Sequence, residues 1–452
     1  MTTRSAASTA TSAGEEVGKR WPLIVLMIVL SLDLLSFTCI LPLLPSIFHR
    51  YADQGDKDPL YFHFNSICSA IQSLLGIPSG SRHSTVFAAG VVGSLFSFLQ
   101  FLASPILGAL SDVHGRKPVL LISVLGSLAS YYLWSQSSSF AIFVASRVIG
   151  GLSKASVSVA IAVVTDVCPP ARRAAGMAMV GVAFSLAFMI GPMVGAYFAS
   201  IARNAEDVNL LPARFAMLLA ITELILVVGI LPETLAPEKR LSGLGSAAWA
   251  DYVSPRALFK FNVLSAEPSK RIQPYGRIYF TYLLLYSSLE FIISFLTHLR
   301  FGYTSADQGR MYFVTGVLMM IIQGGVVRRI PTHRLKDGAL IGLAAIVPAY
   351  LFMAFAYSQM ILYLGLVLYA VASSLVVPCL TTTVSNECAE SEKGACMGVL
   401  RSLGALARAV GPVVGSLLFW LLGPTAAYTI GALALVLPCA LLVSIPRKIK
   451  SK

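Results

Sequence analysis

The sequence predicts an all-α membrane protein with twelve transmembrane helices in two pseudo-symmetric six-helix bundles. Of its 452 residues, 56% are hydrophobic and only 12% are charged, about half the charged fraction of an average soluble domain. The apolar residues form continuous runs of about 20 residues, the length of a helix that crosses a bilayer. Strands of a membrane barrel would instead alternate with a period of two. An internal repeat relates the two halves of the chain.

The apolar runs define the predicted domains. They lie at 22–48, 86–110, 119–135, 140–165, 176–201, 212–232, 277–299, 311–330, 338–356, 360–385, 395–422 and 425–445. We therefore expect a disordered polar tail at 1–21, an N-terminal bundle at 22–232, a linker at 233–276, a C-terminal bundle at 277–445 and a basic tail at 446–452. Residues 1–20 contain no apolar core ending in a cleavage site, so we expect no signal peptide.

The basic residues predict the orientation, because Lys and Arg accumulate in short loops on the cytosolic side. With the N-terminus in the cytosol, 23 of the 34 Lys and Arg residues lie on the cytosolic side and 7 on the other. Both termini are therefore expected in the cytosol, and the net charge of +13 reflects this topology instead of a nucleic-acid partner. Trp249–Phe261 in the linker and Tyr61–Leu75 in an outer loop are amphipathic, which is typical of helices that lie on the membrane or pack on neighbouring segments.

Several kinds of chemistry have no support in the sequence. The seven cysteines are scattered and show no CxxC spacing, so we expect neither a disulfide framework nor a metal site. No nucleotide-binding loop or catalytic triad stands out, which argues against an ATP-driven pump and against an enzyme. We expect a monomer without cofactors whose partners are the lipid bilayer, protons and a small substrate.

A short polar stretch, Gly108–Pro118, separates the second and third runs. So short a turn makes the flanking helices close antiparallel neighbours. Asp112 and Arg116 then lie at the water boundary, where they can pair across helix ends and change partners. The stretch is a candidate conformational switch.

The repeat pairs motifs from the two halves. The residues around Asp33 in the first run match those around Glu290 in the seventh, with one extra residue. The motif Gly-Pro-x-x-Gly at 191–195 recurs at 411–415, at a constant offset of 220. Such repeats are typical of secondary transporters, whose substrate site lies between the halves near the bilayer midplane. Close packing of the fifth and eleventh helices is expected at Gly191, Pro192, Gly195, Gly411, Pro412 and Gly415.

Two acids lie near the centre of predicted helices. At 1.5 Å per residue, Asp33 is about 17 Å into the first run and Glu290 about 20 Å into the seventh. A charge at the centre of a membrane helix costs about 2.5–3.5 kcal/mol, so such a residue is a functional candidate by default. We expect Asp33 and Glu290, together with Arg147, to serve proton coupling. The alternative is a static salt bridge that holds helices together.

Basic residues lie at the same depth. Lys154 is about 21 Å into the fourth run and Arg408 about 20 Å into the eleventh, and Arg147 and Arg401 precede them by seven residues. Because these four cations exceed the two acids, we expect an electropositive cavity for a carboxylate or another anion, in which arginine offers bidentate donors. The candidate substrate-binding residues are Lys154, Arg408, Arg401 and Tyr286. The alternative is that each cation only neutralises an acid.

Three motifs resemble those of a known family. The stretch Gly108–Lys117 resembles the loop motif of the major facilitator superfamily between its second and third helices. Arg147–Gly151 is similar to the fourth-helix motif of that superfamily, and Gly191–Gly195 is similar to the fifth-helix motif of its drug:proton antiporters. The resemblance covers all twelve runs and is greatest to an animal tetracycline-transporter-like branch, which implies efflux of organic anions.

The resemblance also implies a latch. In this superfamily the loop arginine commonly pairs with an acid at the end of the fourth helix, while the loop aspartate faces the start of the eleventh helix. The residues of this sequence that match are Gly108, Asp112, Gly115, Arg116 and Asp166. The second-half copy of the motif has Thr332 at the position of Asp112, so the latch is expected on one half only.

These patterns together predict a secondary active transporter that moves small organic anions or amphiphilic drugs by alternating access, as proton-coupled efflux. Two alternatives stay open: a uniporter or symporter of an amphiphilic metabolite, and a membrane scaffold of the same fold that does not transport. The plasma membrane, the endoplasmic reticulum and the nuclear envelope are all compatible with the sequence.

Overall fold

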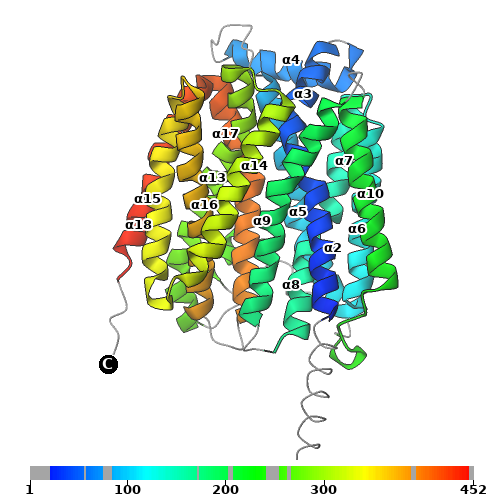
Figure 1. Ribbon diagram of the computed structural model, residues 1–452, viewed down its shortest axis with the longest axis vertical. Coiled ribbons are helices and arrows are strands. Elements are labelled where there is room, and N and C mark those ends of the chain that lie inside the picture. The colour runs from blue at the N-terminus through cyan, green and yellow to red at the C-terminus, as the bar shows by residue number, and fades with distance from the viewer. Residues whose placement is uncertain are drawn as a thin grey trace, which may run out of the picture.

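The structure, a computed structural model, describes residues 21–54, 57–74, 84–169, 173–201, 207–240, 254–261, 266–387 and 393–446. All regular structure in these ranges is helical, and the long helices run side by side (Figure 1). The short helix α4 lies across one end, which we call the α4 face. The other end carries the connection between α5 and α6, and we call it the turn face.

The first bundle contains the helices up to residue 229. They are α2 (Trp21–Thr38), α3 (Leu44–Gln54), α4 (Pro59–Leu74), α5 (Ser84–His114), α6 (Arg116–Ser135), α7 (Phe140–Ser153), α8 (Ser156–Val167), α9 (Arg173–Ser200) and α10 (Asp207–Gly229). The short α12 (Pro255–Lys260) follows. The second bundle consists of α13 (Ala266–Phe301), α14 (Ser305–Gly325), α15 (Leu335–Ala354), α16 (Gln359–Glu387), α17 (Lys393–Ala434) and α18 (Val436–Ser444).

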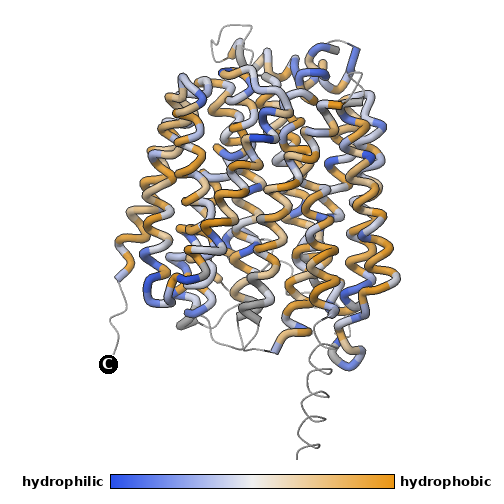
Figure 2. Tube along the Cα trace, viewed as in Figure 1, coloured by the Kyte–Doolittle hydropathy of each residue, from blue (hydrophilic) through white to orange (hydrophobic). Residues whose placement is uncertain are grey.

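The twelve predicted crossings are confirmed. Ten stretches of the described residues are long and apolar enough to span a membrane. One of them, Cys396–Ser444, turns back at Gly423, whose φ of 80° is left-handed, and so makes two crossings. The less apolar α14 runs parallel to the others and supplies the remaining one (Figure 1). Hydrophobic residues fill the middle of the molecule, and hydrophilic ones gather at both ends (Figure 2).

Helix boundaries differ from the apolar runs at identifiable places. The helix α13 begins at Ala266 instead of 277, because the run marks only the part in lipid and the helix continues into water. The fourth run is interrupted at Lys154, where ψ is 88°. Cys396 is also disulfide-bonded, although the sequence predicted no disulfide framework.

The two predicted amphipathic segments both contain helices that pack on the protein. In the linker, α12 packs on α13 and α17 and buries Leu258 and Phe261, whereas residues 249–253 lie outside the described ranges. On the α4 face, the buried Asp58 accepts hydrogen bonds from the backbone N–H groups of Tyr61 (3.1 Å) and Phe140 (2.5 Å). It thereby joins the starts of α4 and α7.

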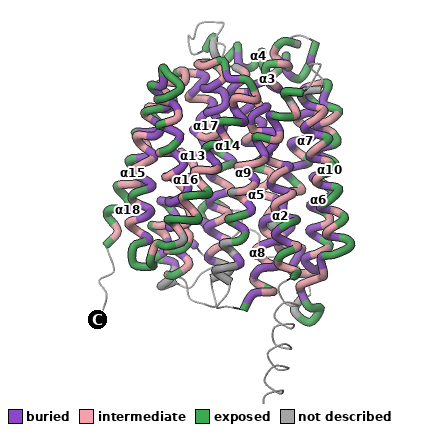
Figure 3. The backbone as a smooth tube through the Cα atoms, viewed as in Figure 1, coloured by how far each residue is buried: buried purple, intermediate pink, exposed green. Residues whose placement is uncertain are grey.

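The two bundles meet on the α4 side of the molecule. A Cβ at Gly90 of α5 would lie 2.7 Å from the carbonyl oxygen of Pro412 of α17, and Ser94 Oγ accepts a hydrogen bond from Val413 N at 2.9 Å. The rings of Phe87 and Trp420 stack with centroids 4.9 Å apart. Figure 3 shows buried residues gathered in this region.

The turn side of the same helices is open. A Cβ at Gly108 of α5, Gly181 of α9, Gly324 of α14 or Gly398 of α17 would meet no atom of the described residues within 4 Å. By contrast, Gly316, nearer the α4 face on α14, lies against Met189 of α9. Within the described residues, the bundles are therefore in close contact on the α4 side and leave open space beside these glycines toward the turn face.

Candidate transport site

The N-terminal bundle holds a buried ion pair at the break between α7 and α8. Lys154 Nζ donates to Asp33 Oδ1 at 2.5 Å, and the two residues are only 4% and 1% exposed. The break is itself supported, because Ser104 Oγ donates to the Lys154 carbonyl (3.1 Å) and Ser123 Oγ accepts from Ala155 N (3.1 Å). In this conformation Lys154 neutralises Asp33 and is not free to bind an anion.

Arg147 lies in the same bundle without an acid beside it. Its guanidinium carbon is 5.5–6.0 Å from the ring centroids of Phe143, Trp134 and Phe96. Nε donates to Ser146 Oγ at 3.2 Å, and the buried Nη2 has no partner among the described residues. Cation–π contacts with desolvated rings therefore stabilise this charge in place of a carboxylate.

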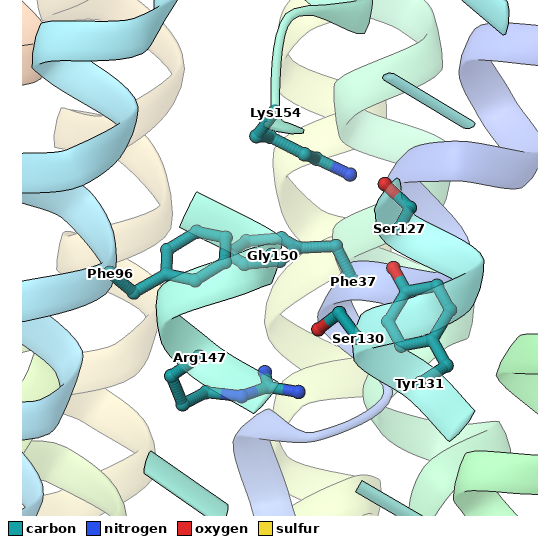
Figure 4. A pocket seen from close by; sticks show the side chains of 8 residues that line it. All are labelled: Phe37, Phe96, Ser127, Ser130, Tyr131, Arg147, Gly150 and Lys154. Atoms are coloured by element: carbon teal, nitrogen blue, oxygen red, sulfur yellow. The ribbon is translucent and has the colours of Figure 1, made fainter. Parts of the chain in front are cut away.

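A small cavity separates the two cations. Its walls include the stacked rings of Phe37 and Phe96, with centroids 5.3 Å apart; Lys154 lies toward the Phe37 ring and Arg147 toward the Phe96 ring (Figure 4). Ser127, Ser130, Tyr131 and Gly150 complete the lining. The space has room for about one water molecule, so it is too small for an organic substrate in this conformation.

Glu290 in the C-terminal bundle has a different environment. Its Oε1 accepts hydrogen bonds from the hydroxyls of Tyr369 (2.8 Å) and Tyr286 (3.1 Å). The two phenol rings stack with centroids 5.4 Å apart, and Ser373 Oγ lies 2.9 Å from Tyr286 Oη. No ion pair of Glu290 occurs among the described residues, so phenols take the position that Lys154 has beside Asp33.

Arg408 is the exposed cation of the site. It lies on α17, fifteen residues or about 22 Å from the start of that helix, and no hydrogen bond or ion pair holds it in the described part of the chain. Glu290 is the acid on which its charge acts. Arg401, half-buried, lies seven residues before it on the same helical face. This face of α17 borders the space that opens toward the turn face.

The predicted latch residues come together at the turn face. Arg116 Nε donates to Asp166 Oδ2 at 2.8 Å, and its Nη1 donates to Asp112 Oδ1 at 2.5 Å and to Ser111 Oγ at 2.7 Å. The expected approach of Asp112 to the start of the eleventh helix is not made in this conformation: no hydrogen bond joins it to the described residues of α17. All these contacts lie within the N-terminal bundle.

Glu233 completes this turn and was not identified from the sequence. Its carboxylate accepts the backbone N–H groups of Arg116 (2.9 Å) and Lys117 (3.1 Å) at the first turn of α6, where a negative charge is favourable. Gly115 has a φ of 103°, and a Cβ there would lie 2.9 Å from Glu233 Cδ. The sequence signal that could have identified Glu233 is its position as an acidic residue directly after the sixth apolar run.

The two Gly-Pro-x-x-Gly motifs make equivalent close contacts in the two bundles. A Cβ at Gly195 of α9 would lie 2.8 Å from the Cys39 carbonyl carbon, and one at Gly415 of α17 would lie 2.7 Å from that of Ser288. Gly191 and Gly411 approach Leu35 and Leu284 in the same way, at 3.1 Å from each carbonyl oxygen. Pro192 and Pro412 lie inside the helices.

A second buried acid of the N-terminal bundle also escaped the sequence analysis. Glu223 on α10 is 1% exposed, and its Oε1 has no hydrogen-bond partner among the described residues. Asp33 and Lys154 are the charged groups that act on it. It lies in an apolar run, so the argument that selected Asp33 and Glu290 applied to it equally.

Comparison with known proteins agrees with this architecture. Residues 26–412 match the family model described as Major Facilitator Superfamily. Major facilitator superfamily domain-containing protein 10 of Bos taurus is 43% identical over 427 residues, 92% of this chain and 91% of the relative. Tetracycline resistance protein, class B, of Escherichia coli is 25% identical over 399 residues, 87% of this chain and 88% of the relative.

A solved structure extends the likeness to three dimensions. The crystal structure of the human organic anion transporter MFSD10 (TETRAN) superimposes with a TM-score of 0.79 at 41% identity and covers 94% of this chain and 99% of that one. The resemblance to the animal tetracycline-transporter-like branch is thus confirmed. With its family model matched over most of its length, the chain belongs to the major facilitator superfamily of membrane transporters.

Proposed function

We propose that this chain is a proton-coupled secondary transporter that exports small organic anions or amphiphilic drugs by alternating access. The observation that carries the proposal is Arg408, an exposed arginine without an ion-pair partner in the described part of the chain, deep within the bundle. A cation at that depth costs about 2.5–3.5 kcal/mol in lipid, so it is stable only against water or a counter-ion. A substrate anion supplies that counter-ion.

The charge balance of the site supports an anionic substrate. Lys154 is neutralised by Asp33, and Arg147 is stabilised by aromatic rings. Arg408 and Arg401 share one face of α17, and the acid on which Arg408 acts, Glu290 of α13, already accepts hydrogen bonds from two phenols. The face of α17 is therefore electropositive, and its two guanidinium groups suit a carboxylate or sulfonate. Tyr286 would border the bound substrate.

The relatives point the same way. The human protein with the same fold is described as an organic anion transporter, and more distant bacterial relatives include tetracycline resistance proteins. An organic anion is the substrate class that an arginine without an ion-pair partner in the described residues would bind.

We assign the turn face to the cytosol, with both termini there, because basic residues outnumber those of the other side by 23 to 7. The conformation described is then open to the cytosol. We assign Asp112, Arg116 and Asp166 to a latch that holds the helix ends of the N-terminal bundle while the site is open, and Asp112 would change partner when the turn face closes.

The geometry also favours one alternative, anion–proton symport. The positive charge of Arg408 stabilises the ionised form of Glu290. An anion bound at Arg408 would cancel part of this effect, so binding of the anion and protonation of Glu290 would promote each other. That linkage is the one a symporter needs, whereas an antiporter needs the two events to compete.

The test is flux of a fluorescent organic anion in proteoliposomes that contain the wild type, Arg408→Ala or the matched control Arg310→Ala. Arg310 is 75% exposed at its side chain and pairs with Asp307 at the start of α14. We expect Arg408→Ala to reduce flux at least about tenfold, the cost of one charge-assisted contact, and Arg310→Ala to leave it unchanged. Equal flux in all three would refute the anion site.

Imposed pH gradients separate the remaining possibilities. Efflux stimulated by an opposing proton gradient supports antiport, stimulation by a parallel gradient supports symport, and indifference supports a uniporter. A folded protein that carries no tested anion in either direction would favour the scaffold.

A further inference from the structure

Glu223 has an unusual position for an acid. It faces the interior of the N-terminal bundle from α10, among Ala216, Ala220 and Val227, which are all 1% exposed or less. Its Oε1 is buried without a hydrogen-bond partner in the described part of the chain. An ionised carboxylate in such a place is far more costly than a protonated one unless a cation pairs with it.

The helices packed against α10 offer few charges. They are α2, α6 and α9. The helix α2 contributes Asp33, and α6 contributes the buried phenol Tyr131 on which Glu223 acts. At its turn-face end α6 also carries Arg116, paired with Asp112 and Asp166, and Lys117, whose Nζ donates to the Val228 carbonyl of α10 at 2.9 Å. Lys154, at the α7–α8 break, is the cation that acts on Glu223. Residues 176–200 of α9 contain no Asp, Glu, Lys, Arg or His.

One cation therefore serves two acids. Lys154 is the nearby base for both Asp33 and Glu223, and it already lies 2.5 Å from Asp33 Oδ1. Arg147 is held among aromatic rings and is not among the groups that act on Glu223. Glu223 accordingly keeps its proton while the pair between Lys154 and Asp33 is intact.

Depth places Glu223 between that pair and the turn face. The helix α2 begins at the turn face and α10 ends there (Figure 1). Asp33 is twelve residues from the first residue of α2, and Glu223 is six residues from the last residue of α10. At 1.5 Å per residue they lie about 18 Å and about 9 Å from those ends. Both Asp33 Oδ2 and Glu223 Oε1 are buried polar atoms without a partner in the described residues, the kind of atom that ordered water satisfies.

We infer that Glu223 is a proton relay between Asp33 and the turn face, with Lys154 as the counter-ion that the two acids share. When Asp33 takes up a proton, its carboxylate becomes neutral and the Lys154 ammonium turns to Glu223. Glu223 then releases its own proton to water at the turn face. One proton is bound and one is released, while Lys154 keeps all of its protons. The inference rests on the proton coupling proposed above and holds for either direction of coupling.

The experiment compares Glu223→Gln with the matched control Glu238→Gln in proteoliposomes. Gln preserves the size of the side chain but cannot give up a proton, and Glu238 is an exposed glutamate on the turn-face connection after α10. We expect Glu223→Gln to lose gradient-stimulated flux at least about tenfold while exchange of labelled for unlabelled anion persists. Glu238→Gln should behave as the wild type does.

The outcomes separate this inference from the proposal beneath it. A wild type that is indifferent to pH gradients removes proton coupling, and the relay with it. If a pH gradient stimulates flux equally in the wild type and in Glu223→Gln, the relay is overturned but proton coupling is not.

Infrared difference spectroscopy supplies a measurement that does not need transport. The carbonyl stretch of a protonated carboxyl group should be present in the wild type and in Glu238→Gln but diminished in Glu223→Gln. An unchanged band in Glu223→Gln overturns the inference. If that variant is not recovered folded, Glu223→Asp is the substitute, and the band should then shift, because the shorter side chain withdraws the carboxyl group from its present surroundings.

Discussion

Removing Lys154 should destabilise the protein more than removing any exposed lysine. In Lys154→Met the length of the side chain is nearly kept, but the Asp33 carboxylate, 1% exposed, loses its only ion-pair partner in the described structure. Breaking a buried pair from one side costs about 3–5 kcal/mol. With an unfolding entropy of roughly 1 kcal/mol/K for a chain of this size, the apparent melting temperature should fall by about 3–5 °C.

The assay is thermal unfolding of detergent-solubilised protein followed by intrinsic fluorescence. Lys270→Met, at an exposed position near the start of α13, is the matched control and should leave the melting temperature unchanged. The double variant Asp33→Asn/Lys154→Met leaves no charge unpaired, so it should recover most of the loss, because a neutral pair of similar volume is tolerated in place of a buried ion pair. Proton-gradient stimulation should be absent from the double variant despite its recovered stability.

Two results would refute this reasoning. If Lys154→Met melts at the same temperature as Lys270→Met, the ion pair contributes nothing to the fold. If the losses measured in Lys154→Met and in the single variant Asp33→Asn simply add in the double variant, the residues do not act as a pair, because coupled residues give non-additive changes.

Three further substitutions test other parts of the structure. Asp112→Asn should reduce transport severalfold without loss of folded protein, because Arg116 keeps its other partners; unchanged transport in proteoliposomes would argue against the latch. Gly195→Val should sharply lower the yield of monodisperse protein in size-exclusion chromatography, since the added side chain meets the Cys39 backbone and overpacking costs about 1–3 kcal/mol. Thr304→Ala removes the N-cap of α14 and should cost about 0.5–2 kcal/mol in thermal unfolding at neutral pH. Hydrogen bonds from Thr304 hold the pKa of Asp307 below its usual 3.8, so this contribution is present above about pH 4 and declines as the pH falls through the lowered pKa; a difference from the wild type that grows on acidification would contradict it.

The sequence was sufficient for the architecture because the bilayer imposes it. A run such as 119–135 must be a helix, since no other local structure satisfies the backbone in lipid. The limits of the helices were less accessible: the apolar run beginning at 277 marks where lipid begins, whereas α13 begins at Ala266 in water. The break at Lys154 depends on hydroxyls from Ser104 and Ser123, which come from other helices.

The sequence predicted which residues belong to the candidate site, but not which of them contact one another. Depth along the helices identified Asp33 and Lys154 without saying that they touch, because helix rotation and distances between helices are set by packing. The same applies to Glu290, whose partners Tyr286 and Tyr369 are separated by 83 positions in the chain. The depth of Glu223 within its apolar run was enough to identify it as a candidate. The repeat did not point to it, because it has no acidic counterpart in the second half.

The two bundles repeat their packing but not their electrostatics. Gly195 and Gly415 bring helices together in the same way, yet Asp33 has a lysine at 2.5 Å where Glu290 has two phenols. The N-terminal bundle therefore pairs Asp33 with Lys154, while the C-terminal bundle presents Arg408 to the open space. Since Lys154 is already paired and Arg147 is enclosed by aromatic rings, the substrate anion should be held chiefly at Arg408 of the C-terminal bundle. The N-terminal bundle, which also carries the ion pair between Asp112 and Arg116 proposed as a latch, would then govern when that space opens.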